Sequence, residues 1–151
     1  MNISQTETIL FSPLFTSKLL LMALAGANNK RLKTELIYYI LPLIYNDVIR
    51  GKLVRSTSKS TFNTFLNTEV KKELIEVEIL LANYRKKTKE ALITLANIHK
   101  ISISNFLYLE QDEEITYSKE QNPILKEYYK AAFYLGLILS KENYTRIFFN
   151  L

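Results

Sequence analysis

The chain contains no cysteine, no tryptophan and a single histidine, and these absences exclude several kinds of chemistry. Without cysteine there is no disulfide framework, no thiolate metal site and no cysteine nucleophile. A Ser-His-Asp arrangement would have to use His99, and a lone histidine near the expected end of a helix is far more often a solvated side chain. The lack of cysteine agrees with a reducing cytoplasm, which is the expected location.

Glycine and proline are also scarce, with three residues of each among 151. The glycines stand at positions 26, 51 and 136, so neither a dinucleotide-binding pattern nor a P-loop can be written, and we expect no cofactor. The acidic residues Glu110, Asp112, Glu113 and Glu114 lack the alternation and the glycine of a calcium loop, so we expect no metal site. No catalytic residue is assigned, and the chain is predicted to be a binding protein rather than an enzyme.

Long apolar runs and a basic N-terminus are missing as well. The longest run, Leu36–Tyr45, falls well short of the roughly 20 residues that a membrane span needs, and the first ten residues lack the basic region of a signal peptide. We therefore expect no membrane contact. What is present is 48% hydrophobic and 23% charged residues, a globular balance that can bury a sizeable core. The net charge of +5 mildly favours an acidic partner such as nucleic acid, although an AT-rich genome would produce the same bias.

Helix signals recur along the chain. Ser12-Pro13 predicts the N-cap and first position of a helix that runs to about Ala27, and Asn122-Pro123 repeats this signal before the last long helix. A second helix is expected from about Thr34, with Pro42 kinking or restarting it and Gly51 following its end.

The middle of the chain changes its period. Lys30, Arg31 and Lys33 are expected in a short basic loop, and Ser56–Leu66 in a short helix. Apolar residues from Val70 to Tyr84 repeat at helical spacing, and Thr88 is expected to cap a separate helix. Two β-prone segments, residues 103–110 and 114–117, then predict a short hairpin.

This order of elements predicts a mainly α, winged-helix-like single domain over residues 1–151, with additional terminal helices. Its parts are a lead-in segment (1–11), the hairpin (103–117) and C-terminal helices (123–151). A plain helical bundle with an incidental hairpin is the alternative.

Two basic stretches are candidate contacts for DNA or for phosphate groups, because they combine cations with hydroxyl side chains or lie close together. The first comprises Arg50, Lys52, Arg55 and Lys59, and the second Arg85, Lys86, Lys87 and Lys89. A solvated surface or docking to an acidic protein would explain the same charges.

Most of the ten tyrosines and eight phenylalanines are expected in the core. Two groups are candidates for a protein interface. One is the hairpin pair Phe106 and Tyr108. The other is the C-terminal segment, which must cover its own domain or a partner because its large apolar side chains would be unfavourable in water; it contains Tyr144, Ile147, Phe148 and Phe149.

Several short segments, taken in order, resemble a known family. They are Ser12-Pro13-Leu14 opening an apolar helix, Tyr39–Ile44 (YILPLI), Arg50 followed by Leu53 and a basic Ser/Thr-rich segment, Thr88–Leu92 (TKEAL), Lys130–Gly136 (KAAFYLG) and Thr145–Phe148 (TRIF). Over nearly its whole length the chain resembles the middle component of three-component ABC ATPase systems, the small subunit of Lamassu-type anti-phage defence complexes.

The resemblance implies an accessory adaptor. Such a subunit bridges an SMC-like ABC ATPase and an effector, often a nuclease, and helps to hold the effector inactive until foreign DNA is sensed. DNA would be contacted through the complex. The alternative from another functional class is a free-standing winged-helix transcriptional regulator, which should be a symmetric dimer that binds a defined DNA site alone.

Overall fold

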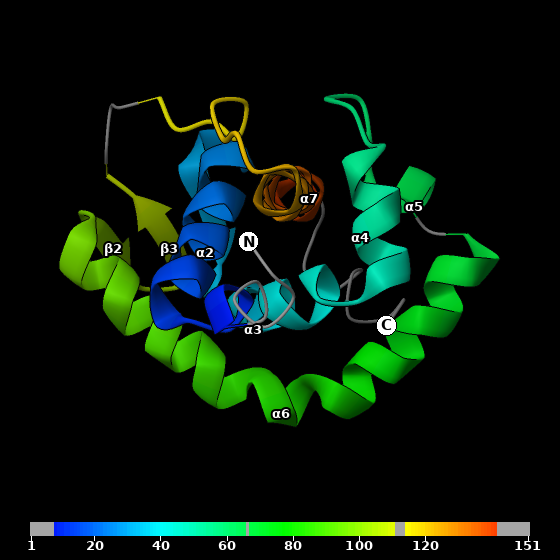
Figure 1. The fold of residues 1–151 in the computed structure, drawn as a ribbon, viewed down its shortest axis with the longest axis horizontal. Coiled ribbons are helices and arrows are strands. Elements are labelled where there is room, and N and C mark those ends of the chain that lie inside the picture. Colours follow the sequence, from blue (N-terminus) through cyan, green and yellow to red (C-terminus); the bar gives the residue numbers. More distant parts are fainter. Residues whose placement is uncertain (1–7, 66, 111–113, 142–151) are drawn as a thin grey trace.

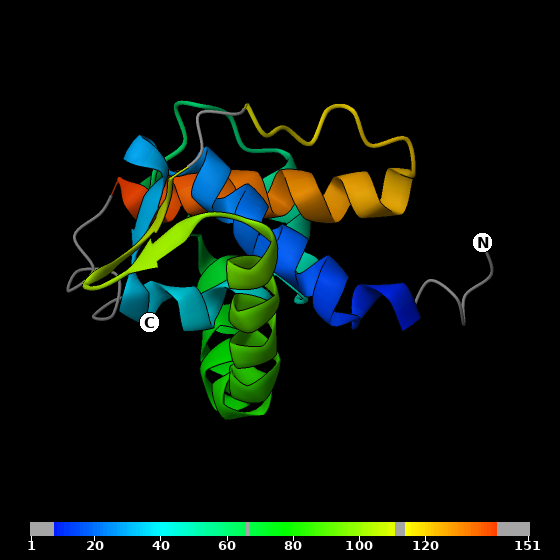
Figure 2. The same cartoon turned by 90° about the vertical axis from the view of Figure 1, so that its left-hand side faces the viewer.

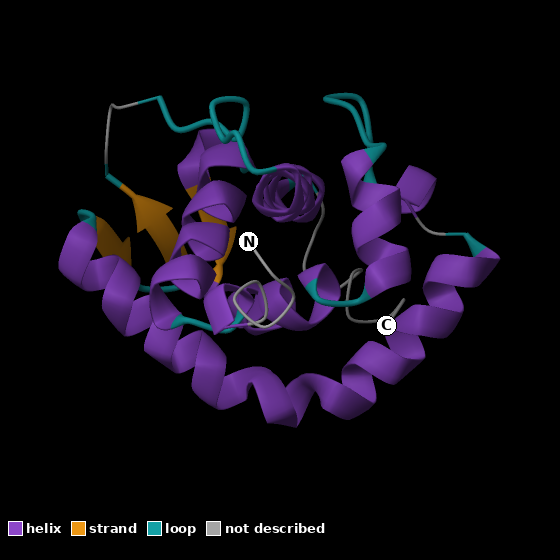
Figure 3. Ribbon diagram, viewed as in Figure 1, coloured by secondary structure: helices purple, strands orange, loops and turns teal. Residues whose placement is uncertain are grey.

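The computed structural model describes residues 8–65, 67–110 and 114–141. They form a mainly helical fold with a small three-stranded antiparallel sheet at one end (Figure 1, Figure 3), which confirms the predicted fold class. In chain order the elements are α2 (Pro13–Gly26), the 3-10 turn η1 (Asn28–Lys30), β1 (Arg31–Lys33), α3 (Thr34–Ile44), α4 (Asp47–Val54), α5 (Phe62–Phe65), α6 (Thr68–Ile98), β2 (Ile101–Ile103), β3 (Phe106–Leu109) and α7 (Pro123–Ser140).

Both predicted Ser/Asn-Pro helix starts are confirmed. The Ser12 side chain accepts a hydrogen bond from the Phe15 amide at 3.3 Å, and Asn122 accepts from the Ile124 amide at 2.9 Å. Each proline supplies the first helical position, where its missing N–H leaves no bond unmade. Residues 8–10, which the sequence assigned to a lead-in segment, are already helical, and Ile9 and Leu10 pack against the core.

Helices α2 and α7 cross at the centre of the fold with their backbones in direct contact (Figure 2). The crossing is made at Gly26 and Gly136. A Cβ on Gly136 would overlap the carbonyl group of Ala23, and a Cβ on Gly26 would overlap that of Phe133. Only glycine allows this approach, so two of the three glycines are fixed by packing rather than by a turn.

The sheet has the strand order β1-β3-β2, with Arg31 opposite Tyr108 and Ile101 opposite Leu109. A hairpin is present, but it is not the predicted pairing of residues 103–110 with 114–117: its strands are residues 101–103 and 106–109, and residues 114–117 form no strand. The Tyr117 ring instead packs against α7, 5.4 Å from Phe133. The predicted basic loop was also wrong, because residues 31–33 form the third strand and bury Leu32.

Helix α6 is one continuous helix of 31 residues, where the sequence predicted two. It curves around the other helices (Figure 1), with Val70, Leu74 and Leu95 buried on its inner side. Thr88 is fully buried inside the helix and caps nothing. The charged residues before Thr88 are good helix formers, so nothing at this point interrupts the helix.

The segment after α3 also differs from the prediction. Helix α3 ends two residues after Pro42, and Asn46 then caps α4 by accepting a hydrogen bond from the Ile49 amide at 3.0 Å. Gly51 lies inside α4 and not after its end. The short helix expected within residues 56–66 is limited to α5, which covers residues 62–65.

Candidate functional site

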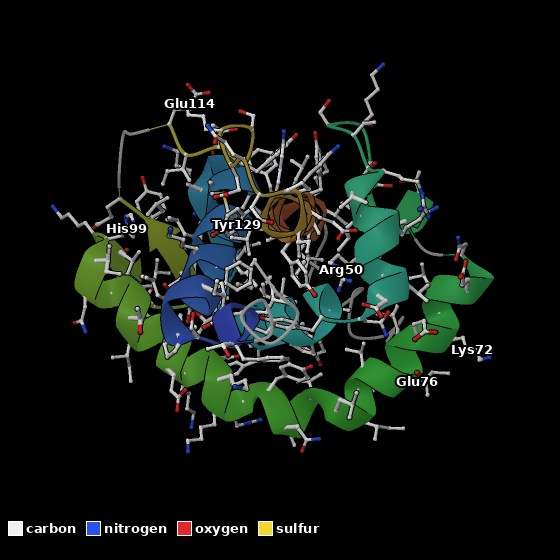
Figure 4. All side chains as sticks on the ribbon, in the orientation of Figure 1. Arg50, Lys72, Glu76, His99, Glu114 and Tyr129 are labelled. Atoms are coloured by element: carbon white, nitrogen blue, oxygen red, sulfur yellow. The ribbon has the colours of Figure 1, made fainter. Side chains whose placement is uncertain are left out.

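Arg50, the first residue of the predicted phosphate-binding stretch, points into the fold between α4 and α7 (Figure 4). Its side chain is only 12% exposed and lies 4.3 Å from the centre of the Tyr128 ring. One guanidinium nitrogen is 2.6 Å from an Asp47 carboxylate oxygen, and the other donates to the Ile44 carbonyl at 3.1 Å. Its Nε lies 3.8 Å from the Glu127 carboxylate.

These contacts give Arg50 a structural role. Because Ile44 is the last residue of α3, its carbonyl has no partner within the helix, and Arg50 supplies one from the next helix. The positive charge is balanced by Asp47 and placed over an aromatic face. The contact between Arg50 and DNA stays an untested prediction, and the geometry offers little of this side chain to a phosphate.

The hydroxyl groups of the same stretch hold a loop together. The Thr57 amide donates to the Ser60 hydroxyl at 2.9 Å, and the Thr61 amide to the Thr64 hydroxyl at 2.8 Å. From the end of α7, the Lys141 ammonium donates to the carbonyls of Ser58 and Ser60 at 2.7 and 2.8 Å. These hydroxyl groups and the Lys141 ammonium therefore stabilise the loop that carries Lys59.

The other cations of this stretch face outward. Arg55 and Lys59 are exposed, and Lys52 is half-buried. Lys52 and Arg55 line a small hollow of ≈ 170 Å³ together with Asp47 and Glu69, so carboxylates offset part of their charge. Arg55 and Lys59 remain the members of the stretch best placed to meet a phosphate backbone.

The second basic stretch lies in the middle of α6. Two of its members lie over aromatic rings of the same fold, with Arg85 5.5 Å from the ring of Tyr38 and Lys87 5.2 Å from that of Phe11. Lys86 and Lys89 are exposed. Arg85 is exposed as well and lines one hollow together with Lys89 and Tyr38, so only Lys87 of the four is partly buried.

An aromatic cluster fills the space beneath these cations. The Tyr45 ring stacks on Phe11 at 5.2 Å and on Tyr84 at 5.9 Å, and its hydroxyl donates to the Leu10 carbonyl. Burial raises the pKa of Tyr45, as do the neighbouring phenols of Tyr128 and Tyr84, while Arg50 lowers it. These phenols therefore stay protonated near neutral pH and support packing rather than proton transfer.

The outer face of the sheet carries a basic hollow that sequence reasoning missed. We call it the sheet hollow; its volume is ≈ 680 Å³, and it is lined by Asn29, Lys30, Arg31, Ser102, Ser104, Phe106 and Tyr108. Arg31 lies 4.5 Å and Lys33 4.7 Å from the centre of the Phe106 ring, and Tyr108 is 40% exposed. The alternation of residues 31–33 was the available signal, because it places both cations on one strand face.

Phe106 and Tyr108 therefore share an accessible face, but in a cationic rather than an apolar setting. The other predicted interface residues, Tyr144, Ile147, Phe148 and Phe149, lie outside the described residues.

The described residues contain no group of three or more acidic or histidine side chains that could hold a metal ion. His99 is the C-cap of α6, and its backbone amide donates to the Leu95 carbonyl at 2.8 Å. Figure 4 places it far from Arg50. None of the helices in the described part of the chain is long and apolar enough to cross a membrane.

The chain was compared with curated proteins, solved structures and models of protein families. No curated protein and no solved structure matches the chain. A family model matches it from residue 1 to residue 151, and that family is described as ABC-three component (ABC-3C) system Middle Component 3. The match spans the basic helices, the sheet and the α2–α7 pair alike, and the chain belongs to this family of middle components of three-component ABC systems.

Proposed function

We propose that the chain is the non-catalytic adaptor of a Lamassu-type anti-phage defence complex in the cytoplasm. It joins an SMC-like ABC ATPase to an effector nuclease and helps to keep the nuclease inactive until foreign DNA is sensed. The observation that carries this proposal is the family match over the whole chain, because a middle component implies partner components.

Co-expression of the three components tests the bridging role. We expect a tagged ATPase to retain the effector only when this chain is present. We also expect the nuclease activity of the assembled complex to rise when phage DNA is added. His99→Ala should change neither result, because the helix cap at His99 is made by its backbone amide, which alanine keeps. Direct binding of the effector to the ATPase without this chain, or equal nuclease activity with and without it, would contradict the proposal.

The chain also assists DNA binding by the complex, through the exposed cations of the first basic stretch. Reversing Arg55 and Lys59 to glutamate should weaken DNA binding and reduce the slope of log K against log salt by about two, one per lost phosphate contact. Lys119→Glu with Lys126→Glu is the control, since both lysines are exposed and the change in net charge is the same. Equal effects of the two pairs on a fluorescence titration would assign the loss to net charge alone.

A free-standing winged-helix DNA-binding regulator is the second candidate, favoured by the strand order β1-β3-β2 and the cationic sheet hollow. Binding of the isolated chain to a defined duplex, as a symmetric dimer, would support this alternative. Dependence of DNA binding on the other components would support the adaptor.

A further inference from the structure

The outer side of α6 exposes large apolar side chains that its own fold does not cover. Of the ten exposed large apolar residues in the described part of the chain, five lie on this helix. The exposed fractions of Ile75, Ile79 and Ile93 are 61%, 75% and 64%. At about 100° per residue, the three side chains fall within about 40° around the helix axis. They lie along one line opposite the buried residues Val77 and Ala91, with Ile93 about four turns beyond Ile79.

The line has the spacing of a coiled-coil seam. Exposed residues follow one another at alternating intervals of four and three, which is the pattern of a and d positions in a heptad repeat. We call this line the outer seam; it comprises Ile75, Ile79, Ala82, Lys86, Lys89, Ile93 and Ala96. All seven residues are exposed, and the other described elements lie on the concave side of the curved α6 (Figure 1); Lys89, at the edge of the seam, also lines a hollow together with Tyr38 and Tyr39 of α3. Figure 4 shows Lys72 and Glu76 on this same outer side.

The length of the seam indicates a helical occupant. The distance from Ile75 to Ile93 is 18 residues, or about 27 Å along the helix axis at 1.5 Å per residue. A helix lying along α6 would meet Ile75 and Ile79 at one end of the seam, the two lysines at its middle and Ile93 at the other end. A loop or a small ligand would reach only part of the line.

The positive charge at the centre of the seam determines which kind of helix can bind there. Lys86 and Lys89 stand between the isoleucine pair at one end and Ile93 at the other. A second copy of this chain would bring lysines against lysines in a parallel pair, and would crowd four lysines near the centre of an antiparallel pair. Like charges at a helix interface are unfavourable. The complementary helix therefore carries carboxylates at its middle and large apolar side chains toward both ends.

We infer that the outer seam of α6 is the docking surface for an amphipathic helix of another component of the three-component system. Carboxylates of that helix face Lys86 and Lys89, and its apolar side chains face Ile75, Ile79 and Ile93. The inference deepens the proposed function and rests on it for the identity of the partner.

Substitution of the three seam isoleucines by serine in the full chain tests the inference. Binding is measured by interferometry against the purified ATPase component and, separately, the purified effector component. We expect the affinity for one of them to fall at least 100-fold, while the thermal midpoint stays unchanged because the three side chains are exposed. Ile103→Ser with Ile124→Ser is the control, since these side chains are 58% and 46% exposed but belong to β2 and α7 rather than to α6.

A second variant tests the charge. Lys86→Glu with Lys89→Glu should lower the same affinity at least tenfold and reduce its dependence on salt, while Lys86→Arg with Lys89→Arg keeps it. Wild-type affinity in the triple serine variant, or a wild-type dimer that this variant abolishes in sedimentation, would overturn the inference and leave the proposed function standing. A wild-type chain that binds neither component would contradict both the inference and the proposed function.

Discussion

Gly136→Ala should lower the free energy of unfolding by about 3 kcal/mol or more, at the upper end of what overpacking costs. The reason is that the added methyl group meets backbone rather than a movable side chain, since it would overlap the Ala23 carbonyl. Helices α2 and α7 would have to separate, and their contact is the most extensive between any two elements described. Urea unfolding followed by circular dichroism measures the effect, and Gly26→Ala should show a similar loss.

Gly51→Ala is the matched control for this experiment. An added Cβ at Gly51 would meet only an Arg55 guanidinium nitrogen at 3.8 Å, and no described glycine has a positive φ. Because Gly51 lies inside α4, alanine should stabilise the fold by about 0.5–1 kcal/mol. An unfolding midpoint of Gly136→Ala equal to that of the wild type would show that the two helices do not approach as closely as described.

Arg50→Met should lower the free energy of unfolding by about 2–3 kcal/mol, through one lost hydrogen bond at a helix end and one lost cation–π contact. Methionine keeps much of the packing volume but offers no donor to the Ile44 carbonyl and no charge to Tyr128. Arg50→Lys should fall between the two, because lysine keeps the charge and loses the forked donor geometry. Thermal unfolding of the purified chain measures all three proteins.

Arg55→Met is the corresponding surface control and should change stability by no more than about 0.5 kcal/mol, because Arg55 is exposed. The pair also separates structural from DNA-binding roles. If Arg50→Met kept the wild-type midpoint but weakened DNA binding by the complex, the result would show that Arg50 contacts phosphate groups rather than stabilising the fold.

The parts of the fold that the sequence predicted well depend on local chemistry. Ser12 and Asn122 cap helices through hydrogen bonds to amides no more than three residues away, so the signal and its effect lie in the same short segment. The β1 strand was missed because its partner is distant. Residue 31 pairs with residue 108, and a three-residue strand shows too little alternation to be recognised alone.

The candidate surfaces also divide into features set by neighbouring residues and features set by residues distant in sequence. A count of charges placed Arg50 with its basic neighbours, yet its exposure depends on Tyr128, which is distant in sequence. For α6, the spacing of the apolar residues from Val70 to Leu81 predicted the face that packs against the core. The exposed isoleucines on the opposite face form a second periodic pattern, which was not predicted from the sequence. Both patterns coexist because a helix of this length can present one face to its core and another to a partner.

The close crossing of α2 and α7 also limits which substitutions relatives of this chain can accept at Gly26 and Gly136. At each glycine the obstacle is a carbonyl group of the opposite helix, and every residue type carries that group. No exchange of a neighbouring side chain can therefore make room for a lost glycine. Gly26 and Gly136 are two separate constraints rather than a compensating pair, and each must be kept for as long as the helices keep their distance.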